Sequence, residues 1–320
     1  MLKKRVIQCL MAVFSAVSVA VSSGASADPL APDKCGRKGN EACIQIGTFN
    51  IKWFGTPSKE PKRTKQESER LADLVSRDID LDLVALIEIN PDSQQFEWFR
   101  ERLKRNDYEV LYKKQGQQSI VIAYDSDQLR YRQGSLRLLA VRDEFDLPEG
   151  CKTGRELRRP LAADFSAGDF DITFVGVHLK SQIGGYCADA IRSAQMSDLR
   201  EAVDKLRDDN SDLDVVVAGD FNAQLTDPSA SPLSADRRYW FLTEPRFRQS
   251  SSGELSYIAP PFEGVIDHIL IMPEVTLEWV PTSTVIYRTA GADSVSPWYL
   301  ERMSDHVPVW SSFYTKKKRN

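Results

Sequence analysis

Short apolar runs rich in β-branched residues recur along the chain, each bounded by turn residues. They cover residues 44–51, 83–89, 120–124, 172–179, 215–218 and 265–272. Runs of this length and composition are typical of β-strands. Several are apolar at nearly every position, which predicts strands that are buried on both faces.

Helical patterns lie between some of these runs, at residues 66–77, 96–103 and 188–206. The first pattern places Leu71, Leu74 and Val75 on one side of a helix. The sequence therefore predicts a mixed α/β chain with more strands than helices.

The chain shows no internal repeat and no Pro/Ser-rich linker. We therefore expect one folded domain at residues 44–315, after an N-terminal loop segment at 28–43. Residues 316–320 form a basic tail, for which a frayed, solvated end is favoured.

The first 27 residues have the pattern of a signal peptide. Basic residues at positions 3–5 precede an apolar run of sixteen residues, 6–21, and small residues follow up to Ala27. The run is shorter than the roughly 20 residues that a membrane span needs. We expect cleavage after Ala27 and export to the periplasm or the medium. Since no second long apolar run follows, no stable membrane association is expected.

Four cysteines follow the predicted signal peptide: Cys35, Cys43, Cys151 and Cys187. An even number in an oxidising compartment favours disulfides, with three possible pairings. The favoured pairs are Cys35 with Cys43, and Cys151 with Cys187. Unpaired thiols remain an alternative, and zinc is disfavoured because no Cys-x-x-Cys pair occurs.

The charge balance limits what the surface can bind. The chain has 42 Lys and Arg against 46 Asp and Glu, a net charge of −4. Removing residues 1–27 takes away three basic and no acidic residues, which gives −7. This balance disfavours an unspecific basic coat for nucleic acid but leaves a local basic groove open. A hydrophobic content of 42% argues against an intrinsically disordered chain.

Polar residues collect at the ends of the apolar runs. They are Asn50, Glu88, His178, Asp220, Asn222, Asp267, His268, Ser304, Asp305 and His306. Strand ends of one sheet share a rim, so these side chains are expected to converge. Singly, each is more typical of a cap or a structural side chain. All three histidines of the chain lie among them, which favours one shared site.

These residue types suit hydrolysis of a phosphate ester. Oxygen ligands such as Glu88, Asn50 and Asp305 favour Mg²⁺, with Mn²⁺ or Ca²⁺ as alternatives. An imidazole held by a carboxylate can deprotonate water.

The ordered motifs resemble those of the endonuclease/exonuclease/phosphatase superfamily, with its deoxyribonuclease I-like fold. The match covers Gly47-Thr-Phe-Asn50, Leu83-Val-Ala-Leu-Ile-Glu88, Gly176-Val-His178, Gly219-Asp220-Phe-Asn222, Ile266-Asp267-His268 and Ser304-Asp305-His306. The resemblance implies two packed mixed β-sheets flanked by helices, a four-layer αββα sandwich. It runs from about residue 44 to residue 309.

The resemblance also implies roles for individual residues. His306 matches the general base and Asp267 the carboxylate that orients it. Glu88 matches the principal Mg²⁺ ligand, with Asn50 and Asp305 close to the metal.

Three further residues have matches in the family. Asp220 and Asn222 match groups that position the nucleophile and the scissile phosphate. His178 matches a histidine that stabilises charge on the phosphate or assists the leaving oxygen. His268 alternates with Asp267 along a strand, so a structural role is favoured for it.

Three positions depart from the family pattern. Ile87 stands where Gln is common, Lys52 where some members carry an acidic residue, and Asn90 where relatives often carry a phosphate-contacting Arg. These departures affect the details of metal binding and substrate contact.

A secreted, metal-dependent endonuclease is the favoured interpretation. The segments at 157–161 and 178–181 look like those of bacterial extracellular nucleases, and they offer Arg158, Arg159, Lys180 and Ser181 to a nucleic acid backbone. A monomer is expected.

Two alternatives remain open. A sphingomyelinase-type phospholipid phosphodiesterase would need an apolar projection, which Trp298 and Tyr299 supply only in part. A non-catalytic or toxin-like module on the same fold is disfavoured by the intact motif residues.

Overall fold

The computed structural model describes residues 42–140, 142, 145–153, 157–209, 214–249, 254–287 and 297–316. The predicted signal peptide, most of the loop segment at 28–43 and most of the basic tail lie outside these residues. Within the described part of the chain, no helix is long and apolar enough to cross a membrane.

The first sheet joins the N-terminal and C-terminal parts of the chain. Its strands, in spatial order, are β12 (Val285–Ile286), β13 (Val309–Tyr314), β1 (Cys43–Phe54), β2 (Leu83–Ile89), β4 (Ser119–Asp125) and β3 (Tyr108–Tyr112). β1 runs parallel to β2 and antiparallel to β13.

The second sheet is built from the middle of the chain. Its strands, in spatial order, are β10 (Trp240–Phe241), β11 (Asp267–Ile271), β9 (Asp214–Asp220), β8 (Phe170–His178), β7 (Leu161–Ala167) and β5 (Arg130–Tyr131), and β6 (Arg137–Leu138) also pairs with β7. β8 and β9 are parallel, whereas β11 runs antiparallel to β9.

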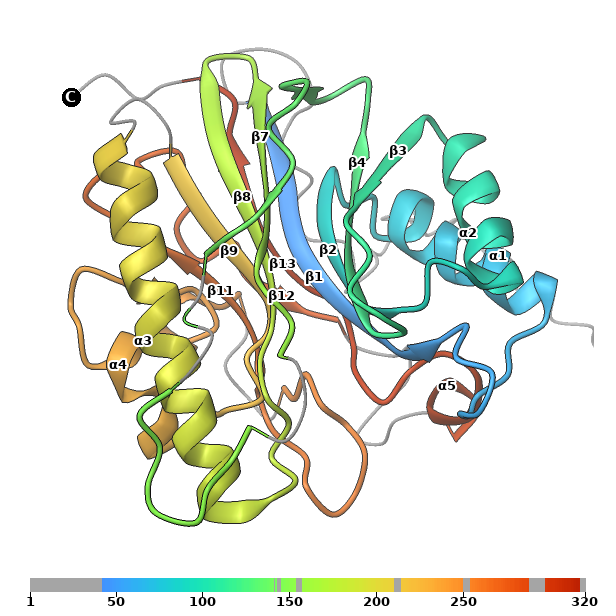
Figure 1. The fold of residues 1–320 in the computed structure, drawn as a ribbon. Coiled ribbons are helices and arrows are strands. Elements are labelled where there is room, and N and C mark those ends of the chain that lie inside the picture. Colours follow the sequence, from blue (N-terminus) through green and yellow to red (C-terminus); the bar gives the residue numbers. More distant parts are fainter. Residues whose placement is uncertain are drawn as a thin grey trace, which may run out of the picture.

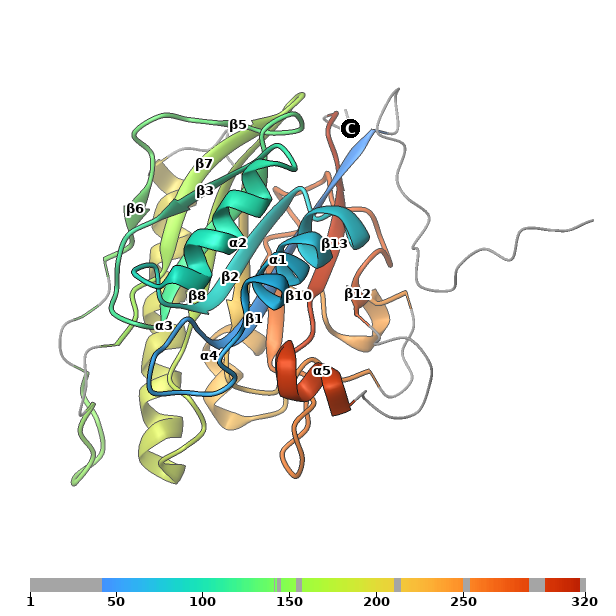
Figure 2. The same ribbon diagram turned by 90° about the vertical axis from the view of Figure 1, so that its right-hand side faces the viewer.

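Helices cover the outer faces of both sheets. α1 (Lys65–Asp73) and α2 (Gln94–Lys104) lie on the first sheet, and α3 (Gly185–Asp209) and α4 (Ser231–Ser234) lie on the second (Figure 1; Figure 2). Thr64 and Glu67 form a capping box that begins α1. The predicted helices are confirmed, although the first one ends in a π-helical turn at Leu74–Asp78. The expected four-layer αββα sandwich is confirmed.

The apolar core lies mainly between the two sheets. Along β9, Val216 and Ala218 belong to this central core, whereas Val215 and Val217 pack under α3 with Leu199. This alternation explains why the run is apolar at every position: each of its faces meets a covering layer. The predicted burial of both strand faces is confirmed.

The topology brings six strand ends to one side of the molecule. β1, β2, β8 and β9 end there, and β11 and β13 begin there because they run antiparallel to β9 and β1. In Figure 1 this is the lower end of the sheets, beside α5 (Pro297–Arg302). Every polar residue that the sequence placed at a strand end therefore lies on the same rim.

Candidate active site

His306 and Asp267 form a buried hydrogen-bonded pair across the two sheets. The distance between His306 Nδ1 and Asp267 Oδ2 is 2.7 Å. Asp267 begins β11, and the Ser256 hydroxyl accepts a hydrogen bond from its amide. The other ring nitrogen, His306 Nε2, lies 4.0 Å from both Asp220 Oδ2 and Asp305 Oδ1. The pair can orient an imidazole whose free nitrogen faces further carboxylates.

Ser304 fixes the backbone that carries His306. Its hydroxyl donates to the carbonyl oxygen of Asn50 at 2.7 Å and accepts from the amide of His306 at 3.1 Å. Ser304 is fully buried. The Ser-Asp-His motif thus contains its own connection to the end of β1.

Asp220 lies at the centre of the site. Asn50 Nδ2 donates to Asp220 Oδ2 at 3.0 Å, and the amide of Asn222 donates to Asp220 Oδ1 at 2.8 Å. Asn222 adopts a left-handed conformation with φ 53°, directly after β9. The residue before Asp220 must be glycine, since a Cβ on Gly219 would lie 2.0 Å from the Val177 carbonyl oxygen.

Glu88 and His178 complete the cluster. Glu88 has φ 66° at an irregularity near the end of β2, and its Oε2 accepts from the Trp53 amide at 2.7 Å. His178 Nε2 lies 3.7 Å from Glu88 Oε1 and 3.8 Å from Asp220 Oδ2. The buried His178 Nδ1 has no hydrogen-bond partner.

The two site histidines have opposite electrostatic surroundings. Burial acts against charge on His306, but the neighbouring Asp267, Asp220 and Asp305 raise its pKa to about 10. Burial, together with the positive charges of Arg158 and His306, holds the pKa of His178 well below its usual range. Burial and the charge of Asp267 raise the pKa of Asp220 to about 7. The surroundings thus favour the charged form of His306 and the neutral form of His178.

Lys52 brings a positive charge to the rim. Its ammonium lies 3.1 Å from Asp305 Oδ2, and its side chain is 30% exposed. The departure from an acidic residue at this position therefore changes the charge directly beside the predicted metal ligands. Tyr257, which no motif indicated, packs its ring 4.9 Å from that of His306.

Arg158 lies beside the cluster, whereas Arg159 turns away from it. Arg158 donates to Gln118 Oε1 at 3.0 Å and to the carbonyl oxygens of His178 and Leu179 at 3.5 and 3.4 Å. Arg159 donates to the Leu139 carbonyl oxygen at 2.9 Å. Of the two arginines, Arg158 is the one that lies near Glu88 and Asp220.

Lys180 and Ser181 follow β8 and belong to a closely hydrogen-bonded loop. The Lys180 ammonium donates to the carbonyl oxygen of Ile183 at 2.7 Å and to that of Ser181 at 3.1 Å. Arg192, buried in α3, donates to the carbonyl oxygens of both Lys180 and Ser181. In this arrangement the Lys180 ammonium stabilises the loop instead of projecting from it.

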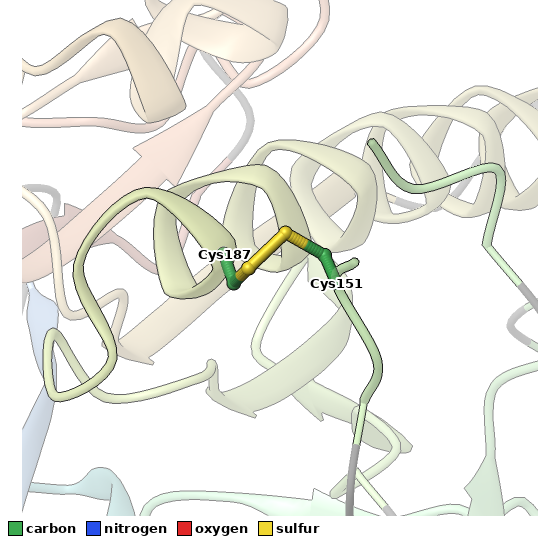
Figure 3. The surroundings of a disulfide bond; sticks show 2 residues. All are labelled: Cys151 and Cys187. Carbon is green, nitrogen blue, oxygen red and sulfur yellow. A yellow bond between two sulfur atoms is a disulfide. The ribbon is translucent and has the colours of Figure 1, made fainter. Parts of the chain in front are cut away.

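A disulfide joins Cys151 to Cys187 in the first turn of α3, as Figure 3 shows. This confirms the predicted pairing. Cys43 is also disulfide-bonded, and its partner lies outside the described residues, so the Cys35–Cys43 pair stays a prediction.

His268 has the structural role expected of it. Its Nε2 donates to the Ala223 carbonyl oxygen at 2.9 Å, so Nδ1 accepts from the Thr243 hydroxyl. Its ring packs against Phe221 and Phe241. Both ring nitrogens have partners, and the imidazole is fixed as the neutral tautomer.

Asn90 and Ile87, the other two departures, have structural surroundings. Asn90 is buried and donates from Nδ2 to the Gly55 carbonyl oxygen at 2.9 Å. Ile87 is fully buried in β2. Neither side chain belongs to the polar cluster.

The cluster fits a hard divalent cation. Its carboxylates outnumber its cations, Asp267 Oδ1 is buried without a hydrogen-bond partner, and the pKa of Asp220 is raised. Ligand atoms of Asp220, Asp267 and His306 lie within 4.8 Å of one another, and the predicted ligands Asn50, Glu88 and Asp305 lie beside this group. Oxygen-rich donor sets of this kind suit Mg²⁺, Mn²⁺ or Ca²⁺.

Solved structures share this architecture. Truncated Caenorhabditis elegans TDP2 superimposes with a TM-score of 0.61 at 14% identity, over 85% of this chain and 97% of that one. D. rerio TDP2 complexed with a single-strand DNA product gives 0.62 at 15% identity, over 85% and 99%. The Bacteroides thetaiotaomicron mannosyl-6-phosphatase Bt3783 gives 0.59 at 19% identity, over 84% and 98%. Identities this low show the fold alone.

No protein of curated function matches the sequence significantly. The sequence pattern that defines the Endonuclease/Exonuclease/phosphatase family, by contrast, matches residues 47–306. This match begins in β1 and ends at His306, so it includes every strand that contributes to the cluster. The chain therefore belongs to the endonuclease/exonuclease/phosphatase family.

Proposed function

We propose that this protein is an exported, divalent-metal-dependent phosphodiesterase, and specifically an endonuclease acting on DNA or RNA. The observation that carries the proposal is the buried pair of His306 and Asp267, whose free Nε2 faces Asp220 and Asp305. This arrangement can take a proton from a water molecule placed beside those carboxylates.

His306 is the general base in this mechanism, and Asp267 orients it. Asp267 holds the proton-bearing Nδ1, so Nε2 is the nitrogen that accepts the proton of the attacking water. Because the pKa of His306 is raised, its neutral, proton-accepting form is disfavoured as long as no positive charge offsets the surrounding carboxylates. The protonated product is stabilised by Asp267.

Glu88, Asn50 and Asp305 would hold the metal. When bound, a divalent cation supplies positive charge that offsets the carboxylates and polarises a phosphoryl oxygen. Lys52 already offsets part of the charge of Asp305.

Asp220 and Asn222 position the water and the scissile phosphate. The Asn222 amide fixes one oxygen of Asp220, and Asn50 fixes the other. Asp220 is thereby held at a single orientation between the two histidines.

His178 stabilises charge on the phosphate through its Nε2–H. A neutral imidazole donates a hydrogen bond but carries no extra proton to give to a leaving oxygen. The depressed pKa of His178 therefore favours charge stabilisation over acid catalysis.

The nucleic acid substrate is supported by the cations around the cluster. Arg158 and Lys52 lie beside it, whereas the side chains of Arg159 and Lys180 donate to backbone carbonyl oxygens of neighbouring loops. Positive side chains at such a rim contact backbone phosphates. Among proteins of the same fold, the D. rerio TDP2 structure holds a DNA product.

A phospholipid substrate has less support. Trp298 is 51% exposed, but Tyr299 is buried and donates from its hydroxyl to the His306 carbonyl oxygen at 3.1 Å. The apolar projection thus reduces to a single aromatic side chain. A non-catalytic role would not require the buried hydrogen bond between His306 and Asp267, so this pair argues against such a role.

The decisive experiment is a nicking assay on supercoiled plasmid with the purified mature chain. We expect nicking with Mg²⁺ or Mn²⁺, its loss with chelator, and its loss in His306→Ala. His268→Gln is the matched control, because it alters a buried histidine outside the cluster. Release of phosphocholine from sphingomyelin without nicking under any divalent metal would contradict the nuclease proposal.

Export has its own test. We expect the protein recovered outside the cytoplasm of the producing cell to begin at Asp28, as read by N-terminal sequencing. Recovery of the intact N-terminus in the cytoplasm would contradict the proposal.

A further inference from the structure

Arg63 is a buried cation inside a stretch of sequence that otherwise looks like an exposed charged loop. Its neighbours Lys59, Lys62 and Lys65 are exposed, whereas Arg63 is 3% exposed. Burying a guanidinium is unfavourable unless its donors are satisfied. The position therefore requires a specific set of acceptors.

The acceptors are backbone carbonyl oxygens from two distant segments. On one side, Nη2 donates to Ile51 at 3.0 Å and Nη1 to Lys52 at 3.2 Å. On the other side, Nη2 also donates to Met303 at 2.5 Å and Nε to Arg302 at 3.2 Å. The guanidinium also packs on the Phe54 ring, 5.3 Å from its centroid. Arg63 thus connects the end of β1 to the end of α5, two segments that lie side by side in Figure 1 and Figure 2.

The β1 segment holds two site residues through a strained backbone. Lys52 and Trp53 are both left-handed, with φ 34° and 49°. In this conformation the Lys52 amide donates to Asn50 Oδ1 at 3.0 Å and the Trp53 amide to Glu88 Oε2 at 2.7 Å. Consecutive left-handed residues other than glycine persist only where their surroundings hold them. Arg63 supplies part of that restraint by binding the carbonyls of Ile51 and Lys52.

The α5 segment leads directly into the catalytic motif. Met303, which Arg63 binds, is followed by Ser304, Asp305 and His306. A displacement of Met303 would therefore move the general base relative to Glu88 and Asn50.

We propose that Arg63 is a positioning residue that holds Asn50 and Glu88 in register with Asp305 and His306. All of these hydrogen bonds go to backbone, so Arg63 acts through the two segments. Its planar fork binds four carbonyl oxygens at once, which the single ammonium of lysine cannot reproduce. The kinetic part of this inference rests on the proposed phosphodiesterase function.

The test compares Arg63→Lys and Arg63→Ala with the control Arg102→Lys in the mature chain. Arg102 pairs with Asp73 between α1 and α2, away from the cluster. We expect kcat of both Arg63 variants to fall about 10- to 100-fold with KM nearly unchanged, because the error is in placement of the reacting groups. Mn²⁺ affinity, measured by calorimetry, should fall about tenfold or more. Added guanidinium should restore part of the kcat of Arg63→Ala, and Arg102→Lys should lose only thermal stability.

Hydrogen exchange supplies a readout that needs neither metal nor turnover. Both Arg63 variants should exchange faster at residues 50–54 and 303–307, with no change in α2. Loss of thermal stability alone, with kcat, Mn²⁺ affinity and exchange at both segments as in Arg102→Lys, would overturn the proposal. If Arg63→Ala does not fold, Arg63→Lys decides by the same measurements. A wild-type protein that hydrolyses no phosphodiester would contradict the proposed function, and the exchange result would then decide on Arg63 alone.

Discussion

At the scale of single residues, His306 and His178 show how the surroundings of an imidazole can shift its pKa in opposite directions. Each imidazole is buried within 4.0 Å of Asp220, but His306 also binds Asp267, whereas His178 has Arg158 nearby. Burial lowers the pKa of His178 and Arg158 lowers it further, whereas Asp267, Asp220 and Asp305 raise the pKa of His306 despite its burial. The opposite shifts of the two pKa values therefore follow from burial and from the charges beside each ring.

Replacing Asp267 tests this explanation. We expect Asp267→Asn to lower the nicking rate by about 100- to 10,000-fold, because the amide neither fixes the Nδ1–H tautomer nor stabilises the imidazolium. The pKa of His306, followed by NMR titration, should fall by comparison with wild type. With three histidines in the chain, assignment is direct. A nicking rate within tenfold of wild type would show that Asp267 does not orient the base.

The sequence predicts those residues of the cluster that lie at or next to the end of a strand. Asn50, Glu88, His178, Asp220, Asp267 and His306 meet because the strand topology brings their ends together. Lys52 and Arg63 were not predictable in this way. The position of Lys52 depends on the left-handed backbone at Lys52 and Trp53. The position of Arg63 depends on acceptors such as the Met303 carbonyl oxygen, which lies 240 residues further along the chain.

At the scale of elements, the apolar runs located the central strands, but β7 was missed. Leu161–Ala167 carries Asp164 and Ser166, which interrupt the apolar pattern. Asp164 is buried because it accepts from Thr173 and pairs with Arg137 at 3.0 Å. These partners of Asp164 lie outside the strand and meet it only in the folded protein. The residues of β7 alone therefore do not have the apolar pattern of a buried strand.

The N-cap of α2 offers a prediction at this scale. Ser93 accepts a hydrogen bond from the Phe96 amide at 3.1 Å. We expect Ser93→Ala to lower the free energy of unfolding by about 1 kcal/mol, measured by urea denaturation. Gln94→Ala, one residue further along, is the exposed control and should change it little. Equal effects of the two substitutions would argue against the cap.

At the scale of the whole molecule, the order of the layers followed from the resemblance and not from the apolar pattern. Periodicity identifies strands but does not say which strand lies beside which. The Cys151–Cys187 pairing was likewise one of three possibilities until the fold placed Cys151 against the first turn of α3.

This disulfide should contribute substantially to stability. It links residues 36 positions apart, for which chain-entropy reasoning gives about 4 kcal/mol. We expect the double variant Cys151→Ser and Cys187→Ser to unfold at lower urea concentration than wild type. A single Cys151→Ser variant should lose a similar amount. An unchanged urea midpoint in the double variant would rule out a stabilising role.

Acid stability provides a second prediction for the whole molecule. Burial lowers the pKa of His268 to about 4, below its ordinary value of 6.5, so the folded protein binds a proton there less readily than the unfolded chain. Stability from this group is complete above pH 6.5 and is lost as the pH falls towards 4, by about 3 kcal/mol. His268→Leu should be less stable at pH 7 but show a shallower decline over this range. Parallel declines in variant and wild type would contradict the assignment.

The hydrogen-bonded pair of His306 and Asp267 spans the two halves of the sandwich. Asp267 begins a strand of the second sheet, and His306 precedes a strand of the first. A folding intermediate with both sheets formed but not yet docked would contain every residue of the cluster without the assembled cluster itself. The proposed nuclease activity therefore requires docked sheets, and a nicking assay on refolding protein would measure when the two sheets come together.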